Sequence, residues 1–244
     1  MTKKLLVLYV AHSYNNRVKH FLEKAVFEDP SIDWVFIYNG LQDSFPIPPY
    51  MKKFKRENIG FDFGGWSDYL LHDPSIQTSY DYYLFINSSA YGPYISPSYS
   101  GKWTDIFIQG LQHNTKLFGC TINTVMDPLH KSHIQSYVFS MDSEALHYLI
   151  QEKTFTTQHY HRTMHEAVWN GEIRMSQLIV KKGWNIGCTW SRFKDVDFTF
   201  QSKPLSEYPY SLIYINDPLW PEFENGLWTR ENLVFVKGNR LHIH

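Results

Sequence analysis

The sequence predicts an α/β fold in one domain, with a mixed, mainly parallel central sheet flanked by helices. Two runs of apolar, β-prone residues, at 5–10 and 33–38, predict buried strands. Between them, apolar side chains recur at the spacing of a helix. A helix that joins two such strands makes them parallel, and parallel sheets bind their ligands at the carboxyl ends of the strands. His12 and Asn39 follow these two strands, so we expect both at a ligand site.

The remaining elements continue this alternation. Residues 13–16 are cap formers, so the first helix begins there, Asp142 caps a later helix, and Gly183 ends another. We expect further strands at 51–57, 80–87, 116–121, 134–141 and 187–190. We expect further helices at 66–71, 103–112, 143–152 and 173–182. The segment 154–172 is polar and histidine-rich, and the last forty residues are predicted to be rich in loops.

The composition excludes several classes of protein. Hydrophobic residues make up 43% and charged residues 19% of the 244 residues, which excludes a disordered chain, and the longest apolar runs are far too short to span a bilayer. A net charge of −1 provides no bulk attraction for nucleic acid, so we expect no such partner. The two cysteines fit neither a disulfide framework nor a zinc motif, which favours a reducing, cytoplasmic location. The aromatic fraction of 17% favours a sugar or nucleotide ligand.

Two segments carry the chemistry that we expect. Residues 56–66 contain three glycines that allow the backbone to approach a ligand, and Asp62 among them can accept from ribose hydroxyls or hold a cation. The alternative is a tight turn in which Asp62 caps a helix. The second segment follows the strand at 80–87, where Asn87, Ser88 and Ser89 suit sugar hydroxyls and phosphate oxygens. Alone, that segment could equally be a turn.

Together these segments resemble a known family. The motif Asn58-x-Gly60-x-Asp62-x-Gly64-x-Trp66, followed by Phe85-Ile-Asn87-x-Ser89-x-Tyr91-Gly92-Pro93, resembles the rhamnan-synthesis protein F family and its virus-encoded relatives, which are GT-A-type glycosyltransferases. Glu172-x-x-x-Ser176 and a terminal motif that includes Lys237 and Arg240 are also similar to that family.

The resemblance implies a GT-A-like, Rossmann-like domain over residues 1–244, with residues 1–100 binding a nucleotide sugar and residues 101–244 binding an acceptor. The implied activity moves a hexosyl or pentosyl group from a UDP- or dTDP-type donor to a glycan or glycoconjugate acceptor, in polysaccharide or glycan biosynthesis. The alternative function is a non-catalytic carbohydrate-binding or scaffold protein derived from such an enzyme.

Cation use is the point at which this sequence departs from the family. The motif that usually reads Asp-x-Asp, and holds a divalent cation on the diphosphate, here reads Asn87-Ser88-Ser89. Amides and hydroxyls are weak ligands for Mg²⁺ or Mn²⁺. Three possibilities follow: weak metal binding, a metal held by Asp62, or a diphosphate neutralised by Lys237 and Arg240.

The resemblance also suggests the catalytic base. Inverting transfer needs one carboxylate to take the acceptor proton, and Glu172 stands at the family position for it. The alternative reading of Glu172 is a first-turn charge at the start of a helix. Asp127 and Asp142 are the other candidate bases.

The histidines suggest two further sites. His161 and His165 are spaced for one helix face, which suggests zinc, but the sequence lacks HExxH, so acceptor-binding or surface roles are favoured. His130 and His133 are predicted to line the acceptor cleft, or else an exposed loop.

Overall fold

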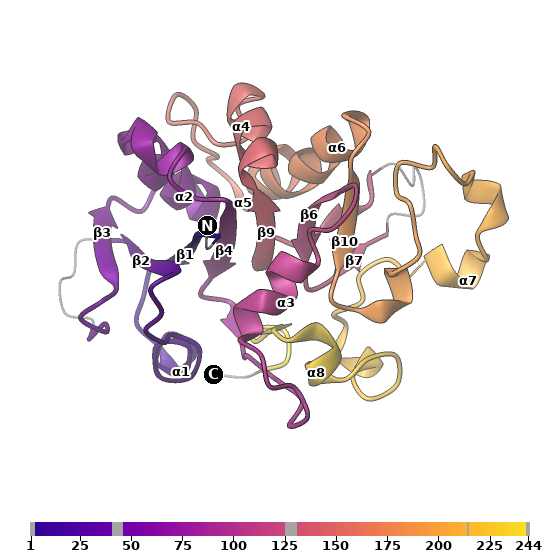
Figure 1. Ribbon diagram of the computed structural model, residues 1–244, viewed down its shortest axis with the longest axis horizontal. Helices are drawn as coiled ribbons and strands as arrows, with labels where there is room; N and C mark the ends of the chain where they lie inside the picture. The colour runs from indigo at the N-terminus through magenta and orange to yellow at the C-terminus, as the bar shows by residue number, and fades with distance from the viewer. Residues whose placement is uncertain (1–2, 41–45, 125–130, 214, 243–244) are drawn as a thin grey trace.

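A seven-stranded mixed sheet organises the protein in a computed structural model that describes residues 3–40, 46–124, 131–213 and 215–242 (Figure 1). Its strands are β1 (Leu5–Ala11), β2 (Ile32–Asn39), β3 (Lys52–Arg56), β4 (Tyr82–Asn87), β6 (Thr115–Gly119), β9 (Val138–Asp142) and β10 (Asn185–Cys188). Their order is β10-β6-β9-β4-β1-β2-β3. Strand β9 is antiparallel to both neighbours and every other adjacent pair is parallel. The predicted fold class is therefore confirmed.

Strand β1 lies between β4 and β2 in this sheet and fixes the position of the site. All seven of its residues are buried, because their unbroken apolar run can face helices on both sides of the sheet. Val10 is in register with Ile37 of β2 on one side and with Asn87 of β4 on the other. The carboxyl ends of three parallel strands consequently meet at one edge.

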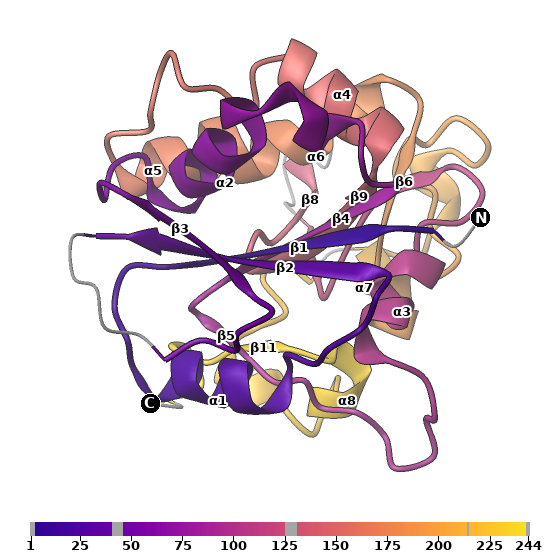
Figure 2. The same ribbon diagram turned by 60° about the vertical axis from the view of Figure 1, so that its left-hand side comes forward.

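The helices form two layers. Figure 2 shows α2 (Phe61–His72), α4 (Ser143–Gln151) and α6 (Arg174–Lys181) on one face of the sheet, with α1 (Asn16–Lys24) and α3 (Trp103–Gln109) on the other. The Asn15 side chain caps α1. The Asp142 carboxylate caps α4 by accepting from the amide of Ala145 at 2.9 Å. Both caps confirm predictions from the sequence.

Helix α2 begins five residues before the predicted start. Gly60 adopts a left-handed φ of 75° and precedes the first helical residue, so the glycine-rich stretch forms the first turns of the helix. Glycine disfavours helix, which is why the local sequence predicts a turn here. No side chain of the described residues caps this helix, so Asp62 does not have the capping role that we considered.

Two other predicted elements differ from the structure. The predicted strand at 134–141 is split into β8 (His133–Ile134), which pairs with β7 (Ile122–Asn123), and β9. The histidine-rich segment ends in helix, because α5 (Met164–Glu166), a π-helical segment (Ala167–Ile173) and α6 follow one another without a break. Glu172 therefore lies within a helical run, which corrects its placement at a helix start.

The last described segment of the chain returns to the carboxyl end of β4, where β5 follows. Helices α7 (Tyr210–Ile213) and α8 (Arg230–Leu233) precede β11 (Val236–Lys237), which pairs antiparallel with β5 (Ala90–Tyr91). The amide of Gly238 donates to the carbonyl oxygen of Ser89 at 2.7 Å. This pairing brings Lys237 to the loop that follows β4. Among the described residues, no helix has the length and apolar character needed to cross a membrane.

Candidate functional site

A cavity of about 1200 Å³ lies at the edge where β1, β2 and β4 end. Its walls come from the strand ends, the first turn of α2, the segment before α5, the π-helical segment and β11. The predicted site residues that line it are His12, Asn39, Asn58, Asp62, Asn87, Ser88, Ser89, Glu172 and Lys237. The structure thus brings together residues that are far apart in the sequence.

Two predicted site residues lie outside this lining. His133 is buried behind Glu172, with its Nε2 atom 3.5 Å from Glu172 Oε1. Arg240 forms an ion pair with Asp217, and its guanidinium lies 5.4 Å from the ring centre of Trp220. Because Arg240 is engaged there, we do not place it on a diphosphate.

The end of β4 is joined to α2 by a side-chain hydrogen bond. Asn87 Nδ2 donates to Asp62 Oδ2 at 2.8 Å. Asn87 Oδ1 accepts from the amide and the hydroxyl of Ser89, at 2.9 and 2.5 Å. These bonds fix the direction of the Asn87 amide and occupy its oxygen.

The same arrangement tests the possibility of a cation. At this strand end, Asp62 supplies the carboxylate that could bind a cation. The neighbouring oxygen of Asn87 already accepts two hydrogen bonds. Over the part of the chain that the structure describes, no three His, Cys, Asp or Glu side chains are grouped to hold a metal ion. This donor set does not fit Mg²⁺ or Mn²⁺, which prefer several anionic oxygens.

Asp62 is in an unusual electrostatic environment. Burial raises the pKa of its carboxyl group to about 6, with a further contribution from the negative charge of Glu172. The hydrogen bond from Asn87 and the positive charge of Lys237 oppose this rise. Asp62 is therefore a carboxylate whose basicity is close to that needed at neutral pH.

Glu172 is in the opposite situation. Its Oε2 atom accepts from the amide of Ser136 at 2.6 Å and from the hydroxyl of Ser136 at 2.7 Å, while Oε1 faces His133. Burial alone would raise the pKa of Glu172, but His133, Lys237 and the Ser136 amide together lower it to about 2. The environment therefore strongly favours the charged form of Glu172.

Among the described residues, Arg17, Arg162 and Lys237 are the Lys and Arg side chains that line this cavity, and two of them lie beside the strand ends. Lys237 arrives on β11, and its charge acts on both Asp62 and Glu172. Arg17 lies in the first turn of α1 and donates from Nε to the carbonyl oxygen of Ser88 at 3.2 Å. The sequence reasoning missed Arg17. A signal was present, since a cation in the first turn of a helix is unfavourable for the helix itself.

The glycines of the first motif make room for an aromatic ring. A Cβ on Gly60 would lie 2.7 Å from the Tyr160 ring, and one on Gly64 would lie 3.3 Å from it. The Tyr160 hydroxyl donates to Asp68 at 2.5 Å, and Arg56 binds the same carboxylate. We expected these glycines to admit a ligand. Gly60 does line the cavity, but its closest neighbour is Tyr160, and this contact joins α2 to the segment before α5, whereas the closest neighbour of Gly64 is the carbonyl oxygen of Ile59.

The histidine-rich segment forms the outer wall of the cavity. Gln158, His159, Tyr160, His161 and Arg162 line it. The zinc alternative fails, because His161 precedes the cap residue of α5 and so shares no helix face with His165. The His161 ring packs instead edge to face against Phe63, with 5.9 Å between the ring centres.

The other candidate residues lie elsewhere. Asp142 caps α4 and binds Lys116 at 2.6 Å, so it serves the structure at the opposite end of β9. Asp127 and His130 lie outside the described residues.

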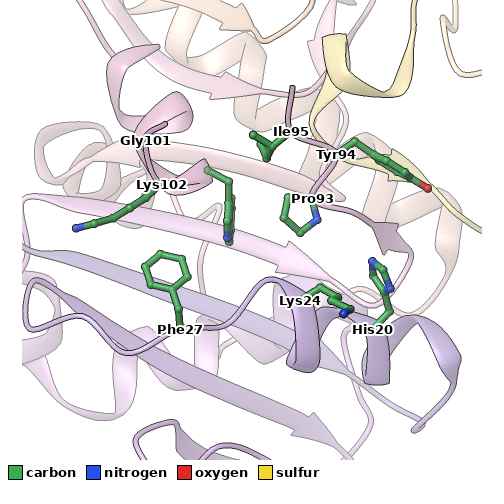
Figure 3. Close-up of a pocket in the computed structure, with 9 residues that line it drawn as sticks. His20, Lys24, Phe27, Pro93, Tyr94, Ile95, Gly101 and Lys102 are labelled. Carbon is green, nitrogen blue, oxygen red and sulfur yellow. The ribbon is translucent and has the colours of Figure 1, made fainter. Parts of the chain in front are cut away.

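A second cavity, of about 600 Å³, lies between α1, the loop after β5 and the start of α3 (Figure 3). Its lining includes the aromatic rings of Phe27, Tyr94 and Trp103, and the rim carries Lys24 and Lys102. Lys102 is paired with Asp29 at 2.5 Å. No carboxylate belongs to its described lining, so this cavity lacks the acid–base groups of the first.

Comparisons with known proteins give distant structural similarities. The sequence matches no protein-family model and no curated protein. The structure is similar to a Drosophila β1,4-galactosyltransferase 7 mutant, solved with manganese, UDP-Gal and xylobiose, at 7% identity over 76% of this chain and 64% of that one, with a TM-score of 0.39. It is similar to a glycosyltransferase that acts in glycosylation of the PBCV-1 major capsid protein, at 16% identity over 68% and 74%, with a TM-score of 0.38. It is also similar to the galactosyltransferase LgtC, solved with donor and acceptor sugar analogues, at 11% identity over 93% of each chain, with a TM-score of 0.38.

Proposed function

We propose that this protein is a glycosyltransferase that moves a hexosyl or pentosyl group from a nucleotide-sugar donor to a glycan or glycoconjugate acceptor, in polysaccharide or glycan biosynthesis. One observation carries the proposal: a single cavity at the carboxyl ends of β1, β2 and β4 contains Asp62, Glu172 and Lys237. Such an edge is where α/β proteins bind nucleotides. The motif resemblance of the sequence supports the same activity.

The donor occupies the strand ends in this proposal. Asn39 and Asn58 present amides, and Ser88 and Ser89 present hydroxyls, that suit the ribose and phosphate oxygens of a UDP or dTDP sugar. Residues 1–100 supply this half of the cavity. Residues 101–244 supply the acceptor half, although Lys237 crosses back to the donor side through the pairing of β11 with β5.

The counter-charge for the diphosphate comes from side chains. The donor set beside Asn87 does not fit a divalent cation, whereas Lys237 and Arg17 both line the cavity. Cationic groups already held in place stabilise the charge that develops on a leaving diphosphate. We therefore propose transfer without a divalent cation.

The reaction is a direct displacement with inversion. The acceptor oxygen attacks the anomeric carbon, the bond from that carbon to the phosphate oxygen breaks, and the electron pair leaves with the nucleoside diphosphate. One carboxylate takes the acceptor proton.

The buried, unbridged cysteines Cys120 and Cys188 accord with the reducing, cytoplasmic location that we propose.

The competing proposal is a carbohydrate-binding or scaffold protein without activity. Isothermal titration with UDP, dTDP, GDP and their sugars separates the two. We expect UDP or dTDP, or one of their sugars, to bind with a Kd below 1 mM. We also expect the protein to transfer or release the sugar of the nucleotide sugar that it binds. If oligosaccharides bind but no nucleotide binds at millimolar concentration, the transferase proposal is withdrawn. A carbohydrate-binding or scaffold protein without activity then replaces it.

A further inference from the structure

Among the described residues, three carboxylates line the cavity at the ends of β1, β2 and β4. They differ in the hydrogen bonds that they accept, and so in whether they can accept a proton from a substrate. They are Asp62, Glu166 and Glu172. Glu166 accepts from the amide of Arg162 at 2.6 Å, next to the Thr163 cap of α5. It therefore completes the start of a helix.

Glu172 has little capacity left for an incoming proton. Both hydrogen bonds from Ser136 end on one of its oxygens, and His133 faces the other at 3.5 Å. The side chain is buried within a π-helical turn, and only 8% of the residue is exposed. An acceptor hydroxyl would have to displace one of these partners before it could reach either oxygen.

Asp62 accepts fewer hydrogen bonds than Glu172 does. Its Oδ2 atom accepts from Asn87, and the structure gives no second hydrogen bond to this carboxylate from the residues that it describes. Asp62 is partly exposed, and it lies in the first turn of α2, which lines the cavity together with the strand ends and the segment 158–162. An acceptor hydroxyl can therefore approach Asp62 Oδ1 without breaking an existing contact.

We infer that Asp62 is the general base of the proposed transfer, and that Glu172 holds Ser136 and His133 in the wall of the cavity. This inference rests on the proposed function. The acceptor hydroxyl gives its proton to Asp62 as its oxygen bonds to the anomeric carbon. The bond to the phosphate oxygen breaks, and the negative charge passes from the Asp62 carboxylate to the leaving nucleoside diphosphate.

The charges around Asp62 suit this transfer. The charges of Lys237 on β11 and Glu172 in the π-helical segment both act on Asp62, and the charge of Asp62 contributes to the raised pKa of the buried Tyr9 of β1. Among the described residues, the other titratable groups of the cavity lining are His12, Arg17, His159, Tyr160, His161, Arg162 and Glu166. Protonation of Asp62 removes a negative charge beside Lys237 at the moment when the diphosphate gains one. Lys237 can therefore stabilise the reactant carboxylate first and the leaving group afterwards.

The test needs no knowledge of the acceptor, because water can take its place. Release of UDP or dTDP from UDP-glucose, UDP-galactose and dTDP-rhamnose is measured from pH 4.5 to 8.5 for the wild type, Asp62→Asn, Glu172→Gln and Asp195→Asn. Asp195 is exposed and lies outside the cavity lining, so its variant is the matched control. We expect release by the wild type to rise with pH through an apparent pKa near 6. We expect Asp62→Asn to lose about 100-fold or more and to lose this pH dependence, whereas Glu172→Gln keeps it.

The opposite pattern overturns the inference. It fails if Asp62→Asn keeps release within about threefold of the wild type, or if Glu172→Gln abolishes the pH dependence and Asp62→Asn retains it. Carbon-13 NMR of aspartate carboxyl groups, assigned with Asp62→Asn, gives a second measurement that needs no turnover. A carboxyl signal of Asp62 that titrates near pH 4 also overturns the inference. Failure of the proposed function looks different, since no nucleotide sugar then binds to the wild type.

Discussion

The ring of Tyr160 occupies the space that a side chain on Gly60 would fill, at 2.7 Å from the position of its Cβ. This contact joins the first turn of α2 to the segment that precedes α5. The first turn of α2 on the donor side is thus in contact with the histidine-rich wall through the Tyr160 ring, in addition to the contact of His161 with Phe63.

We predict that Gly60→Ala destabilises the protein by about 1–3 kcal/mol. The new methyl group would meet Tyr160, and the residue would keep a left-handed φ of 75° that alanine rarely adopts. Gly226→Ala is the control, because the nearest atom to its added Cβ is 3.8 Å away. Urea melts of both variants measure the difference, and equal midpoints would contradict the role given to Tyr160.

We predict that Asp62→Asn stabilises the protein above pH 6, by up to about 3 kcal/mol. The pKa of Asp62 is raised from 3.8 to about 6 in the folded state, so the folded state resists ionisation and loses stability as the pH rises from about 4 to 6. Asparagine removes that loss. Melting temperatures of the variant and the wild type should agree near pH 4 and diverge toward pH 7. Divergence in the opposite direction would show that the charged form is favoured.

Glu172→Gln should have the opposite effect on stability. The pKa of Glu172 falls from 4.5 to about 2 on folding, so its ionised form stabilises the protein above pH 4.5, and this contribution is lost as the pH falls toward 2. We expect the variant to lose about 2–3 kcal/mol at pH 7 and much less at pH 3. Glu152→Gln, at an exposed ion pair with Arg174, is the control and should change little. A loss independent of pH would point to packing alone.

Lys237→Met should weaken the binding of UDP by about tenfold or more and leave the binding of uridine nearly unchanged. The reason is that Lys237 is assigned to the diphosphate and not to the base. Lys194→Met serves as the control, since Lys194 is exposed and lies outside the cavity lining. Calorimetric titration gives both constants. An equal loss for uridine and UDP would move Lys237 away from the phosphates.

We expect EDTA to leave sugar transfer unchanged. The strand end after β4 presents amide and hydroxyl groups, and Lys237 and Arg17 supply the positive charge. Release of nucleoside diphosphate is compared before and after chelation, with added Mn²⁺ as the reverse experiment. Complete loss of activity on chelation, restored by Mn²⁺, would mean that a cation is held by ligands other than Asp62 and Asn87.

The sequence predicted best those features that depend on neighbours along the chain. The strands at 5–10 and 33–38 are unbroken apolar runs, and the caps Asn15 and Asp142 act within three residues of their own positions. The start of α2 was missed because its glycines disfavour helix, and the neighbour that requires a glycine at Gly60, the Tyr160 ring, is a hundred residues away along the chain. The surroundings of Glu172 were equally hidden, since Ser136 is separated from it by 36 residues.

The pairing of β11 with β5 also sets an order of assembly during synthesis. The strand-end residues between His12 and Ser89 leave the ribosome long before Lys237 does, and chains fold progressively from the amino-terminal side. A nascent chain therefore carries Arg17 and Asp62 well before Lys237, the cation whose charge acts on Asp62. The pocket gains Lys237 only when β11 pairs with β5, so the positive charge that we assign to the diphosphate is complete only at the last stage of folding.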